Sequence, residues 1–305
     1  MTHVSDTASS TTPKGILQIC IGMLIIPVLD VFAKLLGGTL SPVEVTFSRF
    51  VVQALLMAPF VIYLKLWRIP PGTLVLQAAR GILLALATVF FFAALKHLPL
   101  AEAISIFFVQ PIILTVISTF FLGEIIRARR IIAIIVGLIG TMIILQPSFL
   151  AFGQPAIYPL GSAVAMAIYM ALTRKISGQV HPFQMQFVVG VVAMLFLGTL
   201  LLVGGVLGVP GTEFLMPNST QIMWIVGMSL AATIGHAFIV WAMANAPASL
   251  LAPFAYVEII GATSLGYLVF DDVPANSTVL GVTIIIASGI YLFHRERKMA
   301  TATPL

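Results

Sequence analysis

Apolar runs of about 20 residues follow one another along the chain, separated by short turns that often contain proline. A helix of this length crosses the hydrocarbon core of a bilayer, and the runs lack the strict alternation of membrane β-strands. The sequence therefore predicts an all-α integral membrane protein with ten transmembrane helices. The expected spans are 16–36, 43–64, 74–95, 100–122, 131–146, 157–176, 184–206, 221–244, 249–270 and 278–293.

Composition supports this class. The chain is 60% hydrophobic and only 8% charged, whereas soluble domains carry about 25% charged residues. A single cysteine, Cys20, excludes a disulfide framework and a site of several thiolates. The histidines are scattered, and no phosphate-binding glycine-rich motif occurs. We expect the lipid bilayer as a partner, with no nucleic acid, no metal and no cofactor.

Basic residues predict the orientation. If the N-terminus is cytoplasmic, only Lys34 and Lys96 fall at outer ends, and Arg49 lies within a span. Such a bias is what the positive-inside rule describes. Both termini are therefore expected in the cytoplasm. The remaining basic residues, all expected at cytoplasmic ends, are Lys14, Lys65, Arg68, Arg80, Arg127, Arg129, Arg130, Arg174, Lys175, Arg295, Arg297 and Lys298.

The second half of the chain resembles the first. Residues 90–146 and 238–294 share one order of apolar helices and turns, and an offset of 148 places Glu258 on Gln110 and Asp272 on Glu124. With five helices in each half, the halves enter the membrane from opposite sides, as inverted repeats around a central cavity. We expect a disordered N-terminus at 1–14, repeats at 15–146 and 157–294, a connector at 147–156 and a tail at 295–305.

Ionisable residues inside spans are expensive, so they are the first candidates for a site. Asp30 and Lys34 share a helix face and either form an ion pair that lets the helix insert or contact cargo. Arg49 either binds a carboxylate, a phosphate or a polarised carbonyl of the cargo, or neutralises Asp30 or Glu44. Pro27 predicts a kink or a break in the first helix.

Glu258 is the strongest central candidate, because it is expected to face Gln110 across the pseudo-two-fold axis. It could take up a coupling proton or hold a cation, or it could be a protonated side chain bonded to a neighbouring helix. His236 could shuttle protons, although a lone histidine is more often a packing residue. Glu124 is expected to cap a helix or contact a loop, with a role in gating as the second choice.

Several short motifs carry a family resemblance. Through them the chain resembles the ten-helix EamA-type members of the drug/metabolite transporter superfamily over nearly its full length. The resemblance implies a basket of helices around a central cavity, a bacterial inner-membrane location and transport by alternating access. The motifs are Asp30-x-x-x-Lys34, Ser41-Pro42, Phe47-Ser48-Arg49-Phe50, Leu122-Gly123-Glu124, Pro253-Phe254-Ala255-Tyr256-Val257-Glu258 and Asp271-Asp272 with Pro274.

Aromatic residues suggest the kind of cargo. The resemblance places the helices of Phe91, Phe107 and Tyr256 around the cavity, and Trp241 is close to His236 in sequence. A partly aromatic cavity would suit a flat or amphipathic organic molecule. Alternatively, individual rings face lipid or pack between helices.

The leading interpretation is a secondary transporter of a small organic metabolite, with uptake of a flavin-like vitamin such as riboflavin as the expected cargo. Export of amino acids, amphipathic metabolites or drugs is the alternative. An intramembrane enzyme is the alternative from another class, although no paired nucleophile and base are visible in the sequence. A channel or a scaffold ranks third, because a scaffold has little need for charges inside lipid.

Overall fold

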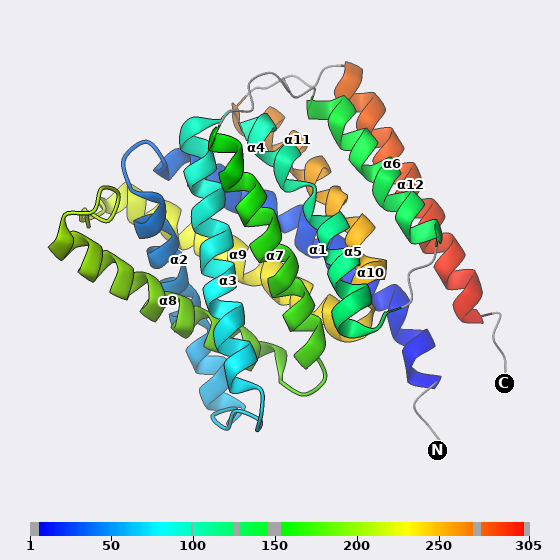
Figure 1. Cartoon of the computed structure of the whole chain (residues 1–305), viewed down its shortest axis with the longest axis horizontal. Coiled ribbons are helices and arrows are strands. Elements are labelled where there is room, and N and C mark those ends of the chain that lie inside the picture. The colour runs from blue at the N-terminus through cyan, green and yellow to red at the C-terminus, as the bar shows by residue number, and fades with distance from the viewer. Residues whose placement is uncertain (1–5, 99, 125–127, 146–153, 271–275, 302–305) are drawn as a thin grey trace.

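The computed structural model describes residues 6–98, 100–124, 128–145, 154–270 and 276–301 (Figure 1). Its regular elements in these ranges are helices, apart from an isolated β-bridge between Ser177 and Val180. The first half contains α1 (Asp6–Leu36), α2 (Pro42–Tyr63), α3 (Leu74–His97), α4 (Leu100–Phe107), α5 (Gln110–Leu122) and α6 (Ala128–Leu145). The second contains η2 (Gln154–Ala156), α7 (Ile157–Ile176), α8 (Pro182–Leu207), α9 (Ser219–Asn245), α10 (Ala248–Leu251), η3 (Ala252–Val257), α11 (Glu258–Phe270) and α12 (Asn276–Thr301).

The helices have the length and polarity of membrane spans. Within the described ranges, six are long and apolar enough to cross a bilayer, and shorter apolar helices occur at Gln110–Leu122 and Val279–His294. Large apolar side chains such as Phe120, Val206 and Leu268 are exposed on the outside of the bundle. Lipid accommodates such a surface, whereas water does not. The prediction of an all-helical membrane protein is confirmed. The six long helices are Thr12–Leu36, Pro42–Tyr63, Leu74–His97, Pro182–Leu207, Ser219–Asn245 and Ala248–Val269.

The first helix differs from the prediction. It begins at Asp6 rather than at residue 16, and it runs through Pro27 without a break. A proline inside a helix removes one backbone hydrogen bond, and neighbouring helices can compensate for this loss in a membrane protein. Here Pro27 is buried and packs close to Gly261 of α11, where the missing side chain leaves room for its ring.

Breaks occur instead in the fourth and ninth predicted spans. The segment expected at 100–122 divides into α4 and α5, and the segment expected at 249–270 divides into α10, η3 and α11. Pro111 stands in the first turn of α5 and Pro253 in the first turn of η3. Proline is tolerated at such a position because the first turn needs no backbone donor. Gln110 and Glu258 are consequently the first residues of α5 and α11.

Helices from the two halves of the chain are interleaved. α1 packs against α9 and α11, while α7 packs against α3 and α5. α2 packs against α8, and α6 lies beside α12 at the edge of the bundle (Figure 1). Close approach of α1 and α9 depends on small residues, because a Cβ added at Gly22 would lie 3.0 Å from the carbonyl oxygen of Gly235. Small residues serve the same purpose in other membrane helix pairs.

The two ends of the described chain lie together. The first turn of α1 and the last turn of α12 are at the same side of the bundle in Figure 1. Placing both ends on one side agrees with an even number of membrane crossings.

Candidate functional site

A small central cavity brings together residues from both halves of the chain. Its volume is about 60 Å³, whereas pockets for drug-sized ligands measure about 300–1,000 Å³. The cavity in this conformation is therefore smaller than a pocket for a drug-sized molecule. The lining includes six candidates from the sequence, Asp30, Arg49, Phe91, Phe107, His236 and Glu258, together with Ile26, Leu29, Ala87, Thr88, Phe92, Ser162 and Met166.

Charges of both signs meet in this cavity. Arg49 of α2 is 1% exposed, and its Nη1 donates to the hydroxyl oxygen of Thr88 at 2.7 Å. Its guanidinium attracts the carboxylate of Asp30 on α1. The carboxyl groups of Asp30 and of Glu258 on α11 line the same cavity. One guanidinium and two carboxyl groups thus lie around a cavity whose remaining lining is largely apolar.

His236 of α9 also lines this cavity. Its ring meets Tyr169 of α7 edge-on, with centroids 5.9 Å apart. Both side chains are buried, and His236 Nδ1 has no hydrogen-bond partner among the described residues. The sequence did not single out Tyr169, because a tyrosine within an apolar run has no pattern of its own.

Arg80 is the largest departure from the sequence interpretation. It was expected at a cytoplasmic end as an orientation signal, but its side chain is 0% exposed. Its Nε donates to the hydroxyl oxygen of Thr173 on α7 at 2.8 Å, and its Cζ lies 5.1 Å from the centroid of the Tyr169 ring. The packing of α7 against α3 covers a residue that hydropathy alone places near a helix end.

Lys34 lies in a second, larger cavity of about 380 Å³ between the ends of α1 and α3 and the start of α2. Lys96 also lines it, so both lysines expected at outer ends face one space. Phe92 borders this cavity as well as the central cavity. The Phe92 side chain therefore stands between the two spaces.

The remaining candidates have packing roles in this conformation. Gln110 is buried and its Nε2 donates to the sulfur of Met170 at 3.2 Å. Tyr256 donates from its hydroxyl to the carbonyl oxygen of Phe108 at 3.3 Å, which supplies a partner at the break before α5. Trp241 packs edge-on against two phenylalanines, on α8 and α9, and is not part of the central lining.

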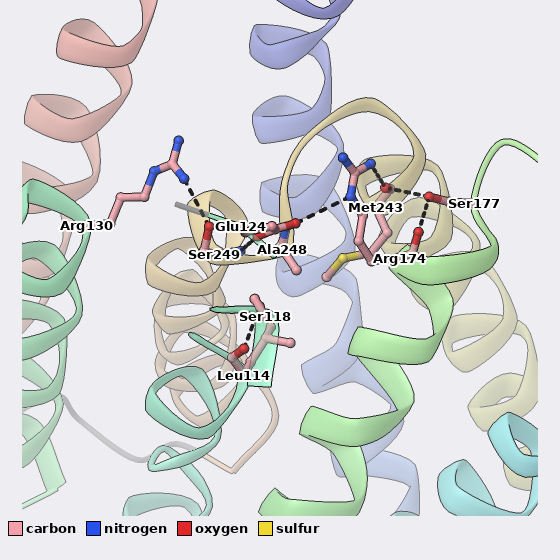
Figure 2. Close-up of polar contacts among 9 residues, drawn as sticks. All are labelled: Leu114, Ser118, Glu124, Arg130, Arg174, Ser177, Met243, Ala248 and Ser249. Carbon is pink, nitrogen blue, oxygen red and sulfur yellow. Dashed lines mark hydrogen bonds and ion pairs between the residues drawn. The ribbon is translucent and has the colours of Figure 1, made fainter. Parts of the chain in front are cut away.

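One end of the bundle is tied together by the carboxylate of Glu124 (Figure 2). It accepts hydrogen bonds from the backbone N–H groups of Ala248 at 3.0 Å and Ser249 at 2.9 Å. The Nε of Arg174 lies 3.5 Å from the same carboxylate, and its Nη1 donates to the carbonyl oxygen of Met243. The contacts match the helix-capping role expected of Glu124 and connect the ends of α5, α7 and α9 to the start of α10. The residue expected at the equivalent position, Asp272, lies outside the described residues.

A further tie strengthens this end. Arg130 of α6 donates from Nη1 to the hydroxyl oxygen of Ser249 at 2.9 Å, so α6 is joined to α10 (Figure 2). Ser177 donates to the carbonyl oxygen of Met243 at 3.0 Å. We call Glu124, Arg130, Arg174, Ala248 and Ser249 the Glu124 cluster. It joins the ends of α5, α7 and α9 to α6 and α10.

Comparison with known proteins identifies the family of transporters to which these features correspond. The pattern of the EamA-like transporter family matches residues 13–146 and again residues 154–294. A solved structure with 19% sequence identity superposes with a TM-score of 0.74, covering 95% of this chain and 99% of that chain. This structural likeness supports the fold. The resemblance to the drug/metabolite transporter superfamily is confirmed.

Named relatives are transporters as well. The S-adenosylmethionine uptake transporter of Rickettsia prowazekii is 25% identical over 295 residues, covering 96% of this chain and 97% of the relative. The pseudopaline exporter CntI of Pseudomonas aeruginosa is 25% identical over 291 residues, covering 93% of this chain and 97% of the relative. Family and relatives point to a transporter rather than an enzyme. The expectation of a flavin-like cargo finds no support in these names.

Proposed function

Because the chain belongs to the EamA-like transporter family, we propose that it carries a small zwitterion derived from an amino acid across the bacterial inner membrane. The central cavity supports this class of cargo by its charges. Asp30 and Glu258 can face a cationic group of the cargo, and Arg49 can face an anionic one. A neutral, flat vitamin would offer no charged group to these side chains, and ionisable groups inside a membrane commonly mark the path of a substrate or ion.

The relatives favour the same chemistry. One relative is named as an S-adenosylmethionine uptake transporter, and S-adenosylmethionine is a derivative of the amino acid methionine. Apolar and aromatic lining from Phe91, Phe107 and Met166 could cover the uncharged part of such a molecule. The observation that carries the proposal is the meeting of opposite charges from α1, α2 and α11 in one cavity.

Alternating access is the mechanism that the arrangement supports best. The helix contacts form exchanged pairs. The contact of α1 with α9 corresponds to that of α7 with α3, and the contact of α1 with α11 corresponds to that of α7 with α5. Exchanged pairs are expected when two five-helix halves are related by a two-fold axis, as in inverted-repeat carriers. We place the end held by the Glu124 cluster at the cytoplasm, following the bias of basic residues. The state shown is then closed to the cytoplasm.

We also propose a coupling role for the two carboxyl groups. Asp30 and Glu258 repel each other when both are ionised. A proton or a cation that neutralises one of them removes this repulsion. Cargo with a positive group would have the same effect. Competition between proton and cargo at one carboxyl pair is a simple way to link their movements.

Export of the same class of cargo is the second proposal. The similarity to the pseudopaline exporter favours it, and it covers nearly as much of the chain as the similarity to the uptake transporter. The carboxyl pair and Arg49 would serve either direction, because a carrier with a central site is reversible in principle.

Two assays test the proposed function. Ligand-induced thermal stabilisation of the purified protein should distinguish S-adenosylmethionine and L-methionine from riboflavin and adenosine. Counterflow into proteoliposomes should then show saturable exchange of the stabilising compound, recovered chemically unchanged. Stabilisation by riboflavin alone would overturn the cargo class. Conversion of a substrate without net movement would favour an intramembrane enzyme instead.

A further inference from the structure

Arg80 is buried without enough partners for its charge. The guanidinium has five N–H donors, yet Nη1 and Nη2 have no hydrogen-bond partner among the described residues. Nε is bonded to Thr173, and the Tyr169 side chain is the other polar neighbour of the guanidinium, with its ring centroid 5.1 Å from Cζ. Leaving donors of a charged group unsatisfied in the interior is strongly unfavourable. The unsatisfied donors of Arg80 therefore indicate a functional role for this side chain.

Arg49 is also buried with unsatisfied donors. Its Nη1 is bonded to Thr88, but its Nε and Nη2 have no partner among the described residues. The Tyr169 ring lies against Arg80 and meets His236 edge-on, and His236 lines the central cavity together with Arg49. Arg49 and Arg80 are thus connected by Tyr169 and His236, with four unsatisfied nitrogen atoms between them.

We propose that Arg80 and Arg49 together bind the carboxylate of the cargo, while Asp30 and Glu258 face its cationic part. This assignment rests on the proposed function and adds Arg80 to the site. Planar guanidinium groups suit a carboxylate because each can donate two parallel hydrogen bonds. A carboxylate between them would supply acceptors for the unsatisfied nitrogen atoms.

The position of Arg80 along α3 indicates when the contact forms. Arg80 precedes Thr88 by eight residues, or about 12 Å along the helix, toward its first turn. The Arg80 side chain does not line the central cavity in this structure. Its partner Thr173 is followed in α7 by Arg174 of the Glu124 cluster. Opening of that cluster would move α7 away from α3 and expose Arg80 to the cargo.

Ordered water is the competing explanation for the unsatisfied nitrogen atoms, since buried waters commonly bridge such groups. It makes a different prediction. If Arg80 serves only packing, its replacement lowers stability equally with and without cargo. If Arg80 binds the carboxylate, its replacement lowers the preference for a carboxylated cargo.

The test compares two matched probes, S-adenosylmethionine and decarboxylated S-adenosylmethionine, which lacks the carboxylate. Binding to the purified full-length protein is measured by thermal stabilisation and by competition in counterflow. We expect the wild type to bind the decarboxylated probe roughly 10- to 100-fold more weakly, as for the loss of charge-assisted hydrogen bonds. Arg80→Gln should reduce this preference to the part that Arg49 alone supplies. Arg80→Lys keeps the positive charge but loses the planar guanidinium that can bind a carboxylate through two hydrogen bonds. It should retain only part of the preference for the carboxylated probe.

Arg68→Gln is the matched control, because it removes the same charge from an exposed arginine outside the bundle core. It should behave as the wild type. Retention of the full preference by Arg80→Gln, or by Arg80→Lys if the first variant does not fold, would overturn the assignment. A wild type that binds both probes equally would also overturn it. Failure of the proposed function looks different, because the wild type would then neither bind nor exchange any zwitterion.

Discussion

Removing the carboxylate of Glu124 should open the closed end of the bundle. Glu124→Ala deletes the acceptor of two backbone hydrogen bonds, at 3.0 and 2.9 Å, and of the ion pair with Arg174 at 3.5 Å. Hydrogen bonds to a charged group contribute about 1.5–3 kcal/mol each when buried. The Glu124 side chain is 11% exposed, and water replaces part of these contacts in the open state. A net loss of about 2 kcal/mol is a reasonable expectation, or about a 30-fold shift toward the open state.

Cysteine accessibility measures this shift. Ser162 lines the central cavity, and Ser162→Cys in a Cys20→Ser background provides a single reactive thiol. A membrane-impermeant maleimide is applied to the cytoplasmic face of inverted vesicles. Glu124→Ala should raise the labelling rate by about 30-fold if opening limits the reaction.

A matched control separates this effect from a general loss of charge. Glu213 is an exposed acid in the loop between α8 and α9, where it accepts a hydrogen bond from the backbone N–H of Gly211. Glu213→Ala should leave the labelling rate at its original value. An unchanged rate in Glu124→Ala would refute the reasoning, because it would mean that the Glu124 cluster does not hold this end closed.

Three further predictions follow from the site and the packing. Glu258→Gln should remove the pH dependence of uptake if the carboxyl pair carries the coupling proton, and a pH profile like that of the wild type would exclude this role. Arg49→Ala should weaken binding of an anionic or zwitterionic cargo by roughly 10-fold or more relative to a neutral analogue, whereas equal losses would indicate a structural role. Gly22→Leu should lower the unfolding temperature, because overpacking of the α1–α9 contact costs about 1–3 kcal/mol. Gly38→Ala is its control, since a Cβ at Gly38 meets nothing within 4 Å.

The class and family of the fold could be predicted from the sequence because they depend on long-range hydropathy and on the order of motifs. The breaks in the fourth and ninth predicted spans could not. Both runs are predominantly apolar despite Gln110 and Glu258, and Pro111 and Pro253 are compatible with either a kink or a new first turn. Pro27 gave the same signal, yet α1 continues through it. Tertiary packing, which one sequence does not reveal, decides among these outcomes.

The site was predicted in part. Asp30, Arg49, His236 and Glu258 stood out because ionisable groups are rare in lipid, and the structure places all four around one cavity. Arg80 was misread, since a charge close to the start of a helix is usually an orientation signal. Its burial depends on α7, a helix from the other half of the chain.

The most direct measurement is counterflow of labelled S-adenosylmethionine into proteoliposomes loaded with the unlabelled compound. Wild-type protein should accumulate label transiently and saturably, and Asp30→Asn and Arg49→Ala should each reduce this exchange by roughly 10-fold or more. Excess riboflavin should not compete. Absence of counterflow for S-adenosylmethionine and for L-methionine, or undiminished exchange in both variants, would contradict a central zwitterion site.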